Sequence, residues 1–212
     1  MNATIIPKRL ALLATIMLLS LGIFAEGKPL PTTLEEVGQL LSQHPCTRGS
    51  FVQEKLLPTI KRPLTSSGTF LITADRGIIW QTEKPYPSIM VVGGSHVSQG
   101  TSPDTITRMD TSSNRLFMEF SQAISAAFSG DVKRIQDSFH VNFSHGDCQW
   151  TLLLEPREKT VAQLVKSIQL QGDQLLKMVT MTEQTGSTIA YIFSHHSFSQ
   201  EPTEYENQLL DK

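Results

Sequence analysis

The feature that most constrains this chain is a two-residue alternation of apolar and polar residues, repeated in many short runs. It is clearest where Phe139, Val141 and Phe143 alternate with polar residues. Because successive side chains of a β-strand point to opposite faces, each run predicts a strand with one apolar face. Such runs lie at 49–56, 68–73, 77–81, 88–92, 95–99, 138–144, 148–154, 161–170, 175–182 and 187–193, with the turn dipeptide Gly93-Gly94 between two of them. About ten strands at hairpin spacing favour an antiparallel sheet curled toward a barrel.

Two stretches have the period of an α-helix instead. Thr33 and Glu36 form a capping-box signal at the start of a helix over about 34–41. A second stripe, with apolar residues every three or four positions, predicts a helix over about 116–128, and Asp131 can cap a short turn after it. The apolar residues of the two stripes include Leu34, Val37, Leu41, Phe117, Phe120 and Ile124.

The first 25 residues predict a secretory signal peptide. Lys8 and Arg9 precede an apolar run at 10–24, and Ala25 supplies a small residue for cleavage. The run is shorter than the roughly 20 residues that a membrane span needs. We therefore expect an exported mature chain of residues 26–212, and the absence of a repeat or linker predicts that it is one domain.

Two cysteines, Cys46 and Cys148, remain in the predicted mature chain. An even count in an exported chain favours a disulfide. A disulfide that closes the loop between these two cysteines would stabilise the fold by roughly 4–5 kcal/mol in the chain-entropy model. Two separate buried thiols are the alternative.

The composition and the motifs exclude several classes of function. A net charge of −2 and a pI of about 6.3 lack the basic footprint of a nucleic-acid-binding protein. No nucleophile elbow, zinc-protease motif or P-loop is present. His195 and His196 are adjacent on a strand and would point to opposite faces, and Ser95-His96 lies at a hairpin turn without a nearby acid. We expect a protein that is not an enzyme and that has no metal site and no cofactor.

The apolar residues of the strands and of the second helix exceed what a small curled sheet needs. They can fill an ordinary packed core, and composition does not exclude that. They can also line a cavity whose covering helices swing away to admit an apolar ligand.

Several short motifs, in order along the chain, resemble the periplasmic outer-membrane lipoprotein carrier family, the LolA-like proteins. The most specific is Gly77-Ile78-Ile79-Trp80 followed by Lys84-Pro85-Tyr86-Pro87. The others are Phe51-Val52-Gln53, the segment 63–70, Ser129-Gly130-Asp131, and Cys148-Gln149-Trp150 leading to Leu154-Glu155-Pro156. The similarity covers about residues 34–193, and the predicted disulfide, which the best-known carriers lack, indicates a divergent branch.

The resemblance implies a mainly β fold with helices: an incomplete antiparallel barrel of about ten to eleven strands, closed by an α-helical lid over a hydrophobic cavity. It implies a monomeric periplasmic carrier of a Gram-negative bacterium that shuttles acylated lipoproteins, or a related acylated lipid, between the membranes. The donor would be an inner-membrane ABC transporter or exporter, and the acceptor would lie in the outer membrane. A bare 16-carbon chain costs on the order of 12 kcal/mol in water, which a carrier removes.

We assign site residues by combining the alternation with the resemblance. Twelve residues are expected to line the cavity: Phe51, Phe70, Ile72, Ile78, Trp80, Ile89, Val91, Phe139, Val141, Phe143, Trp150 and Leu152. The lid is expected to consist of Leu34, Val37, Leu41, Phe117, Phe120 and Ile124. The family carries an arginine six residues before the strand tryptophan, where this chain has Ala74, so Arg76 is the candidate for a replacement lid latch.

Two rival functions remain open at this point. The first is a lipid-binding or sensor module of the same fold that does not transport its ligand. The second is a small periplasmic hydrolase that uses Ser95 or His96. Neither rival is excluded by the motifs above.

Overall fold

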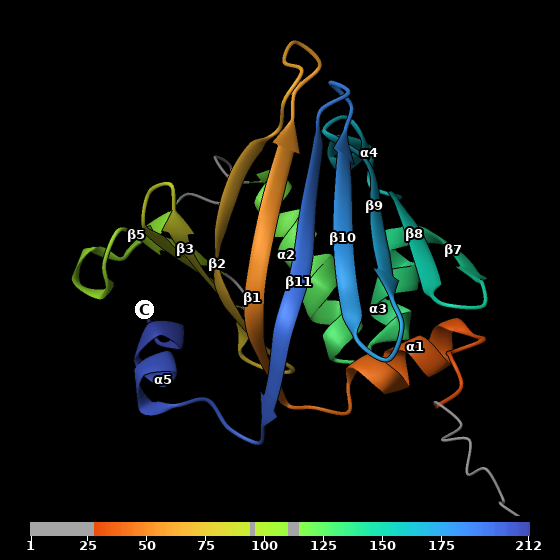
Figure 1. Cartoon of the computed structure of the whole chain (residues 1–212), viewed down its shortest axis with the longest axis horizontal. Coiled ribbons are helices and arrows are strands. Elements are labelled where there is room, and N and C mark those ends of the chain that lie inside the picture. Colours follow the sequence, from red (N-terminus) through yellow and green to blue (C-terminus); the bar gives the residue numbers. More distant parts are fainter. Residues whose placement is uncertain (1–27, 94–95, 110–114) are drawn as a thin grey trace, which may run out of the picture.

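The computed structural model describes residues 28–93, 96–109 and 115–212, apart from the side chains of 115–118 and 120. Its strands form one antiparallel sheet (Figure 1). The strands are β1 (Cys46–Leu56), β2 (Leu64–Thr73), β3 (Gly77–Lys84), β4 (Ser88–Val92), β5 (Val97–Gly100), β6 (Thr107–Met109), β7 (Phe139–His145), β8 (Trp150–Pro156), β9 (Val165–Gly172), β10 (Leu176–Glu183) and β11 (Thr188–Ser199). Their order across the sheet is β6-β5-β4-β3-β2-β1-β11-β10-β9-β8-β7.

The sheet does not close into a barrel, because β6 and β7 lie at its two ends. Its middle is a pairing between the first and the last strand, with Phe51 of β1 opposite Phe193 of β11. The incomplete antiparallel barrel predicted from the sequence is confirmed. The alternation missed only β6, which is three residues long and too short to show a period.

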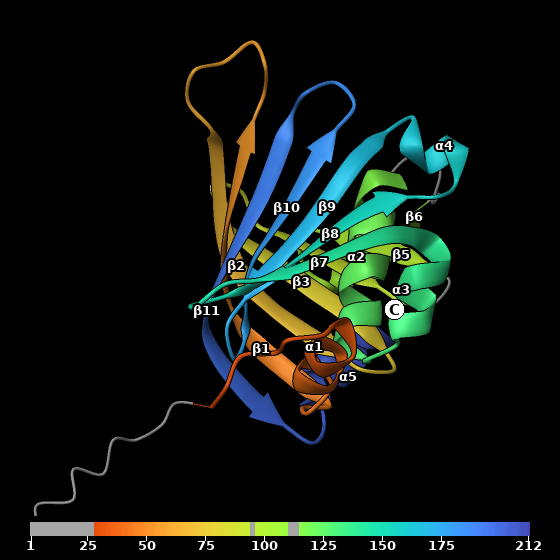
Figure 2. The ribbon, with the colours of Figure 1, turned by 90° about the vertical axis from the view of Figure 1, so that its right-hand side faces the viewer.

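Three helices cover one face of the sheet, which we call the inner face and which carries Phe70 and Trp80 (Figure 2). They are α1 (Leu34–Leu41), α2 (Arg115–Phe128) and α3 (Val132–Ser138). Both α1 and α3 have their predicted N-cap: the Thr33 hydroxyl accepts the N–H of Glu36 at 3.1 Å, and the Asp131 carboxylate accepts the N–H of Arg134 at 2.9 Å. The predicted capping box is only half formed, because the Glu36 carboxylate accepts the N–H of Thr32 in place of that of Thr33. Each cap satisfies a main-chain donor that the first helical turn would otherwise leave unpaired.

The main core lies between these helices and the inner face. Trp150, Leu152 and Leu154 of β8 are fully buried there, together with Ile124 of α2. Burial alternates along β8, because these three residues lie on the face that packs inward and Leu153 lies on the other face.

A second, smaller apolar cluster lies on the opposite face, which we call the outer face. It consists of Cys46, Leu71, Ile79, Ile89, Val91, Leu209 and Leu210, with Ile106 packed against it. Leu209 and Leu210 belong to α5 (Glu204–Leu210), a helix that lies over β3 and β4 near the end of the chain (Figure 1). The sequence left residues after 195 without a structure, whereas β11 continues to Ser199 and α5 follows it.

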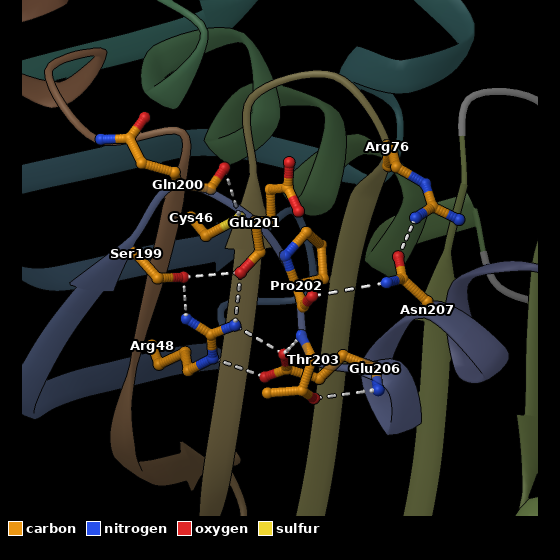
Figure 3. A network of polar contacts seen from close by, with 10 residues as sticks. All are labelled: Cys46, Arg48, Arg76, Ser199, Gln200, Glu201, Pro202, Thr203, Glu206 and Asn207. Carbon is orange, nitrogen blue, oxygen red and sulfur yellow. Dashed lines mark hydrogen bonds and ion pairs between the residues drawn. The ribbon is translucent and has the colours of Figure 1, made fainter.

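Polar contacts hold α5 in place (Figure 3). The Arg48 guanidinium forms a two-pronged pair with Glu206, with Nε–Oε1 and Nη2–Oε2 distances of 2.6 Å. Arg76 donates to the side chain of Asn207 and pairs with Asp211 at 2.5 Å. This corrects the expectation that Arg76 latches the lid, because its side chain binds α5 and not the helices of the inner face.

The expected disulfide is also corrected, because Cys46 and Cys148 are both unpaired. Cys46 is buried at the start of β1, and Cys148 is exposed just before β8. Four strand spacings separate β1 from β8 in the sheet, which is about 19 Å at roughly 4.8 Å per spacing. A disulfide needs Cα atoms within about 7 Å.

Two local boundaries differ from the sequence prediction. Val161 lies in a helical turn, α4 (Lys159–Ala162), and β9 begins only at Val165. The β4–β5 ladder ends at the pair Val92–Val97, so the connection is longer than the two-residue turn predicted at Gly93-Gly94. Gly94 itself lies outside the described residues. A 3-10 turn at Pro103–Thr105 completes the described elements.

Candidate functional site

The inner face has a hollow of about 270 Å³ at one end of the main core. Strands β1 to β4 and β11 surround it. Its lining residues are Phe51, Gln53, Ser66, Trp80, Thr82, Ser88, Met90 and Tyr191. Apolar side chains of Phe51, Trp80 and Met90 face this space.

Small residues on the inner face explain why a hollow forms here. Gly68 of β2 lies between Phe51 of β1 and Thr82 of β3 in the strand registers. It supplies no side chain, and Ser66 and Ser88 next to the hollow are also small. The glycine is required, because a Cβ at position 68 would overlap the main-chain carbonyl oxygen of Gln81. The residue that lets β2 and β3 approach therefore also leaves the space unfilled.

Aromatic rings form the apolar wall of the hollow. The centroids of Phe51 and Trp80 lie 5.2 Å apart at an interplanar angle of 85°, and Trp80 and Tyr191 lie 5.1 Å apart. Phe70 and Phe193 continue the wall toward the helices, 5.1 Å from each other. The Phe51–Trp80 and Phe70–Phe193 pairs are edge-to-face, an arrangement that adds to the free energy gained by burying the rings.

No residue lining the hollow carries a charge at neutral pH. Burial raises the pKa of the Tyr191 phenol far above its usual value, so this ring stays neutral at all physiological pH values. The other polar side-chain groups are the hydroxyls of Ser66, Thr82 and Ser88, the amide of Gln53 and the indole N–H of Trp80. An apolar wall with a few neutral polar groups suits a hydrocarbon chain that carries a polar head.

The structure brings together most of the residues that the sequence assigned to the cavity. Phe51 and Trp80 line the hollow itself. The main core contains Phe70, Ile72, Ile78, Phe139, Trp150 and Leu152, with Val141 and Phe143 partly buried against it. Their contact with a ligand stays a prediction, because these residues pack against the helices or lie at the β7 end of the sheet.

The placement of Ile89 and Val91 is corrected. In the β3–β4 ladder, Trp80 pairs with Met90, so Met90 shares the inner face with the tryptophan. Ile89 and Val91 point the other way and belong to the outer cluster under α5. Both faces of β4 carry apolar residues that are covered, so the alternation could not show which one faces inward.

The residues assigned to the lid that the structure describes all belong to the main core: Leu34, Val37, Leu41 and Ile124. Phe117 and Phe120 lie in the α2 segment, but their side chains are outside the described part. The helices therefore cover the inner face as expected. Their movement as a lid is a prediction.

Sequence reasoning missed Gln53, Met90 and Tyr191 as lining residues. Tyr191 could have been found, because it shares an apolar face with Ile189 and Phe193 in the strand predicted at 187–193. Met90 needed the register of β3 and β4, which a single sequence does not give.

The histidine pair at the end of β11 behaves as its adjacent positions predict. His196 contacts the Phe70 ring on the inner face at 5.9 Å, and burial lowers its pKa. His195 faces the outer side, beside Arg48 and Ser197. Among the described residues, no group of histidine, cysteine and carboxylate side chains is arranged to hold a metal ion. The described helices also include none that is long and apolar enough to cross a membrane.

Comparison with known proteins decides the family. Residues 43–205 match the family model described as outer membrane lipoprotein carrier protein LolA. This chain belongs to the LolA family. The match contains all eight residues that line the hollow, whereas α1 precedes it and most of α5 follows it.

Solved structures similar to this LolA-family chain are distant. A LolA superfamily protein from Nitrosomonas europaea is 11% identical with a TM-score of 0.45, and the match covers 81% of this chain and 96% of that one. A DUF1329 family protein from Desulfovibrio piger is 9% identical over 81% and 92%, with a TM-score of 0.47. A putative outer membrane lipoprotein-sorting protein domain from Vibrio parahaemolyticus is 11% identical over 84% and 97%, with a TM-score of 0.43. No curated protein matches the chain in sequence. The family assignment therefore rests on the family model.

Proposed function

We propose that this protein is a periplasmic carrier that binds the acyl chains of a lipoprotein, or of a related acylated lipid, in the inner-face hollow. The observation that carries the proposal is the uncharged hollow of about 270 Å³, walled by aromatic rings, in a LolA-family fold. Residues 1–25 would be the signal peptide that exports the chain, and they lie outside the described residues.

The geometry fits an acyl chain that enters with its end first. The chain would lie along Phe51, Trp80 and Met90, and its polar head would remain near the hydroxyls of Ser66 and Ser88. Each methylene removed from water gains about 0.8 kcal/mol, so even part of a chain gives substantial binding free energy.

The size of the hollow predicts that the helices move on binding. Its volume lies just below the usual range of about 300–1,000 Å³ for small-molecule pockets, and the adjacent main core is filled by side chains such as Phe70 and Ile124. A full-length chain would therefore have to displace α1, α2 and α3 from the inner face. Because displacing these packed helices costs free energy, the net affinity for the acyl chain would be lower, and the chain could be released.

Transfer would involve no covalent step by this protein. In the proposed function, directionality comes from the partners: an inner-membrane ABC transporter or exporter as donor, and an outer-membrane acceptor. The cargo would move by exchange between apolar sites of different affinity.

The test uses two tryptophan substitutions on neighbouring residues of β1. Gln53→Trp places a large ring in the hollow, whereas Val52→Trp places the same ring on the outer face, where Val52 is 37% exposed. We expect Gln53→Trp to weaken binding of a fluorescent 18-carbon fatty acid by at least about tenfold, equivalent to 1.4 kcal/mol. Val52→Trp should bind like the wild type. Equal binding by all three proteins would refute the site.

A second experiment distinguishes a carrier from the rival functions. Mass spectrometry of organic extracts of the protein purified from the periplasm should find an acylated molecule in equimolar amount. Mixing the loaded protein with outer-membrane vesicles should then transfer that molecule. Retention of the ligand would favour the sensor, and release of a cleaved product would favour the hydrolase.

A further inference from the structure

The end strand β7 has a free edge: none of the described strands pairs with its outer side (Figure 1). Two hydrogen bonds at the ends of the β7–β8 ladder show which residues of β7 form main-chain hydrogen bonds with β8. Arg157 N donates to Ser138 O at 3.0 Å, and Gly146 N donates to Gln149 O at 2.9 Å. Hydrogen-bonded pairs alternate with non-bonded ones along an antiparallel ladder. The even-numbered residues of β7 therefore bond to β8, and the odd-numbered residues direct their main-chain groups away from the sheet.

The outward groups of Val141, Phe143 and His145 have no hydrogen-bond partner among the described residues. The carbonyl of Phe139 is different, because it accepts the Nε–H of Arg157 at 3.0 Å. The free part of the edge thus runs from 141 to 145, with donors and acceptors at every second residue. Such an array can accept another strand.

The opposite end of the sheet is protected, and this contrast is informative. The strand β6 has three residues with Arg108 in the middle, and the Arg108 Nε–H approaches the carbonyl of Lys212 at 3.5 Å. Short strands and central charges are the usual means of preventing edge-to-edge pairing. The strand β7 has seven residues, Phe-His-Val-Asn-Phe-Ser-His, without lysine, arginine, proline or glycine. One edge is thus blocked and the other is left open to pairing.

In place of the monomer that the resemblance implies, we propose that β7 pairs with β7 of a second copy of this chain, in an antiparallel arrangement about a two-fold axis at Asn142. In this register Val141 lies opposite Phe143 of the second copy, and both have outward main-chain groups. Each such pair exchanges two main-chain hydrogen bonds, and symmetry makes the pair occur twice. The same surface is used by both copies, so the interface closes and a filament does not form.

Side chains and charges fit a second copy better than an unrelated strand. Val141 and Phe143 are only partly buried at the end of the main core. In the proposed dimer, the inner faces of the two sheets would be continuous, so these side chains of one copy would lie beside those of the other. The end of β7 at Phe139 has Arg157 close by, together with the exposed Asp137 of α3, and the exposed Asp147 follows His145 at the other end. The two-fold axis places Phe139 opposite His145 of the second copy, which brings the Arg157 end of each copy to the Asp147 end of the other.

This inference does not depend on the proposed function. The hollow is formed by β1 to β4 and β11, and three strands, β10, β9 and β8, separate β11 from β7. A dimer would therefore leave the hollow open, and loss of the dimer would leave lipid binding unchanged.

The first test is disulfide trapping in the full chain with Cys148→Ser, which leaves only the buried Cys46. Asn142→Cys places two thiols across the axis in a non-bonded pair, where Cβ atoms lie about 4.5–5.5 Å apart. Ser144→Cys is the matched control, because the two copies of residue 144 would be about 13 Å apart, four residues along the strand. Mild oxidation should link the first variant into dimers and leave the second monomeric. No dimer with Asn142→Cys, or equal linking of both variants, would overturn the proposal.

The second test measures the size of the unlinked protein by sedimentation. Val141→Pro removes an N–H that points away from β8, so the fold should be retained, as circular dichroism would show. Val141→Thr keeps that N–H and serves as the control. We expect the wild type and Val141→Thr to sediment as dimers and Val141→Pro as a monomer. A monomeric wild type, including one that instead binds a strand from another protein, would refute pairing between copies.

Discussion

The Arg48–Glu206 pair should stabilise the fold by an amount that depends on pH. The side chains are 21% and 15% exposed, between the limits of a surface pair and a buried one. Surface pairs contribute up to about 1 kcal/mol, and breaking a buried pair costs about 3–5 kcal/mol. Glu206→Gln keeps the capping box with Thr203, because glutamine also serves in this position. It removes only the charged, two-pronged pair, so we expect the free energy of unfolding to fall by about 2 kcal/mol at neutral pH.

The pH dependence separates this effect from a packing defect. Burial alone would raise the pKa of Glu206, but the hydrogen bonds from Arg48 and Thr203 outweigh it, and the pKa lies below the ordinary value of 4.5. A carboxyl whose pKa is lowered by folding stabilises the protein above 4.5, and this contribution disappears as the pH falls through the lowered value.

Urea denaturation of the wild type and Glu206→Gln at neutral pH and at about pH 3 measures the contribution. The difference between them should nearly vanish at the lower pH. Glu204→Gln, at an exposed position of the same helix, is the control and should match the wild type at both pH values. An unchanged difference at low pH, or none at neutral pH, would refute the reasoning.

Three further predictions concern Gly68 in the sheet, the two thiols and the expected lack of hydrolytic activity. Gly68→Ala should reduce the free energy of unfolding by about 3 kcal/mol, because the added Cβ meets a main-chain oxygen of β3. Gly146→Ala, at a position with open space, should change it little in the same urea titration. Native protein should react with Ellman's reagent at Cys148 only, because Cys46 is buried and burial raises the pKa of its thiol. Unfolding in urea should make a second thiol reactive. A protein without any reactive thiol would contain a disulfide and would contradict this prediction. His96→Ala should leave the background hydrolysis of an acyl ester unchanged, and a loss of turnover would support the hydrolase.

The sequence predicts strands best where one face of the strand is apolar. Trp150, Leu152 and Leu154 share one face of β8 and all three are fully buried, so the strand was found although Leu153 lies on its other face. In β4 the same reasoning failed, because the residues on both faces are covered. Ile89 packs under α5 and Met90 borders the hollow. The assignment of such a strand depends on its neighbours, which one sequence does not supply.

The sequence contains a signal for the start of α5, but the helix was not predicted because it lacks an apolar stripe. Thr203 and Glu206 form a capping box, which predicts a helix start. Only Leu209 and Leu210 of this short helix are buried, too few to produce a helical stripe. Counting cysteines failed for a different reason, since the number of thiols says nothing about how many strands lie between them.

The pairing of β1 with β11 at the centre of the sheet has a consequence for how the molecule forms. Residues Thr188–Ser199 have to be synthesised before β11 can join the two halves of the sheet. These are β2 to β6 beyond β1 on one side, and β7 to β10 on the other. Contacts between residues so distant in sequence slow folding. A nascent chain that lacks β11 cannot build the complete sheet, so the two halves stay separate until this strand has been made.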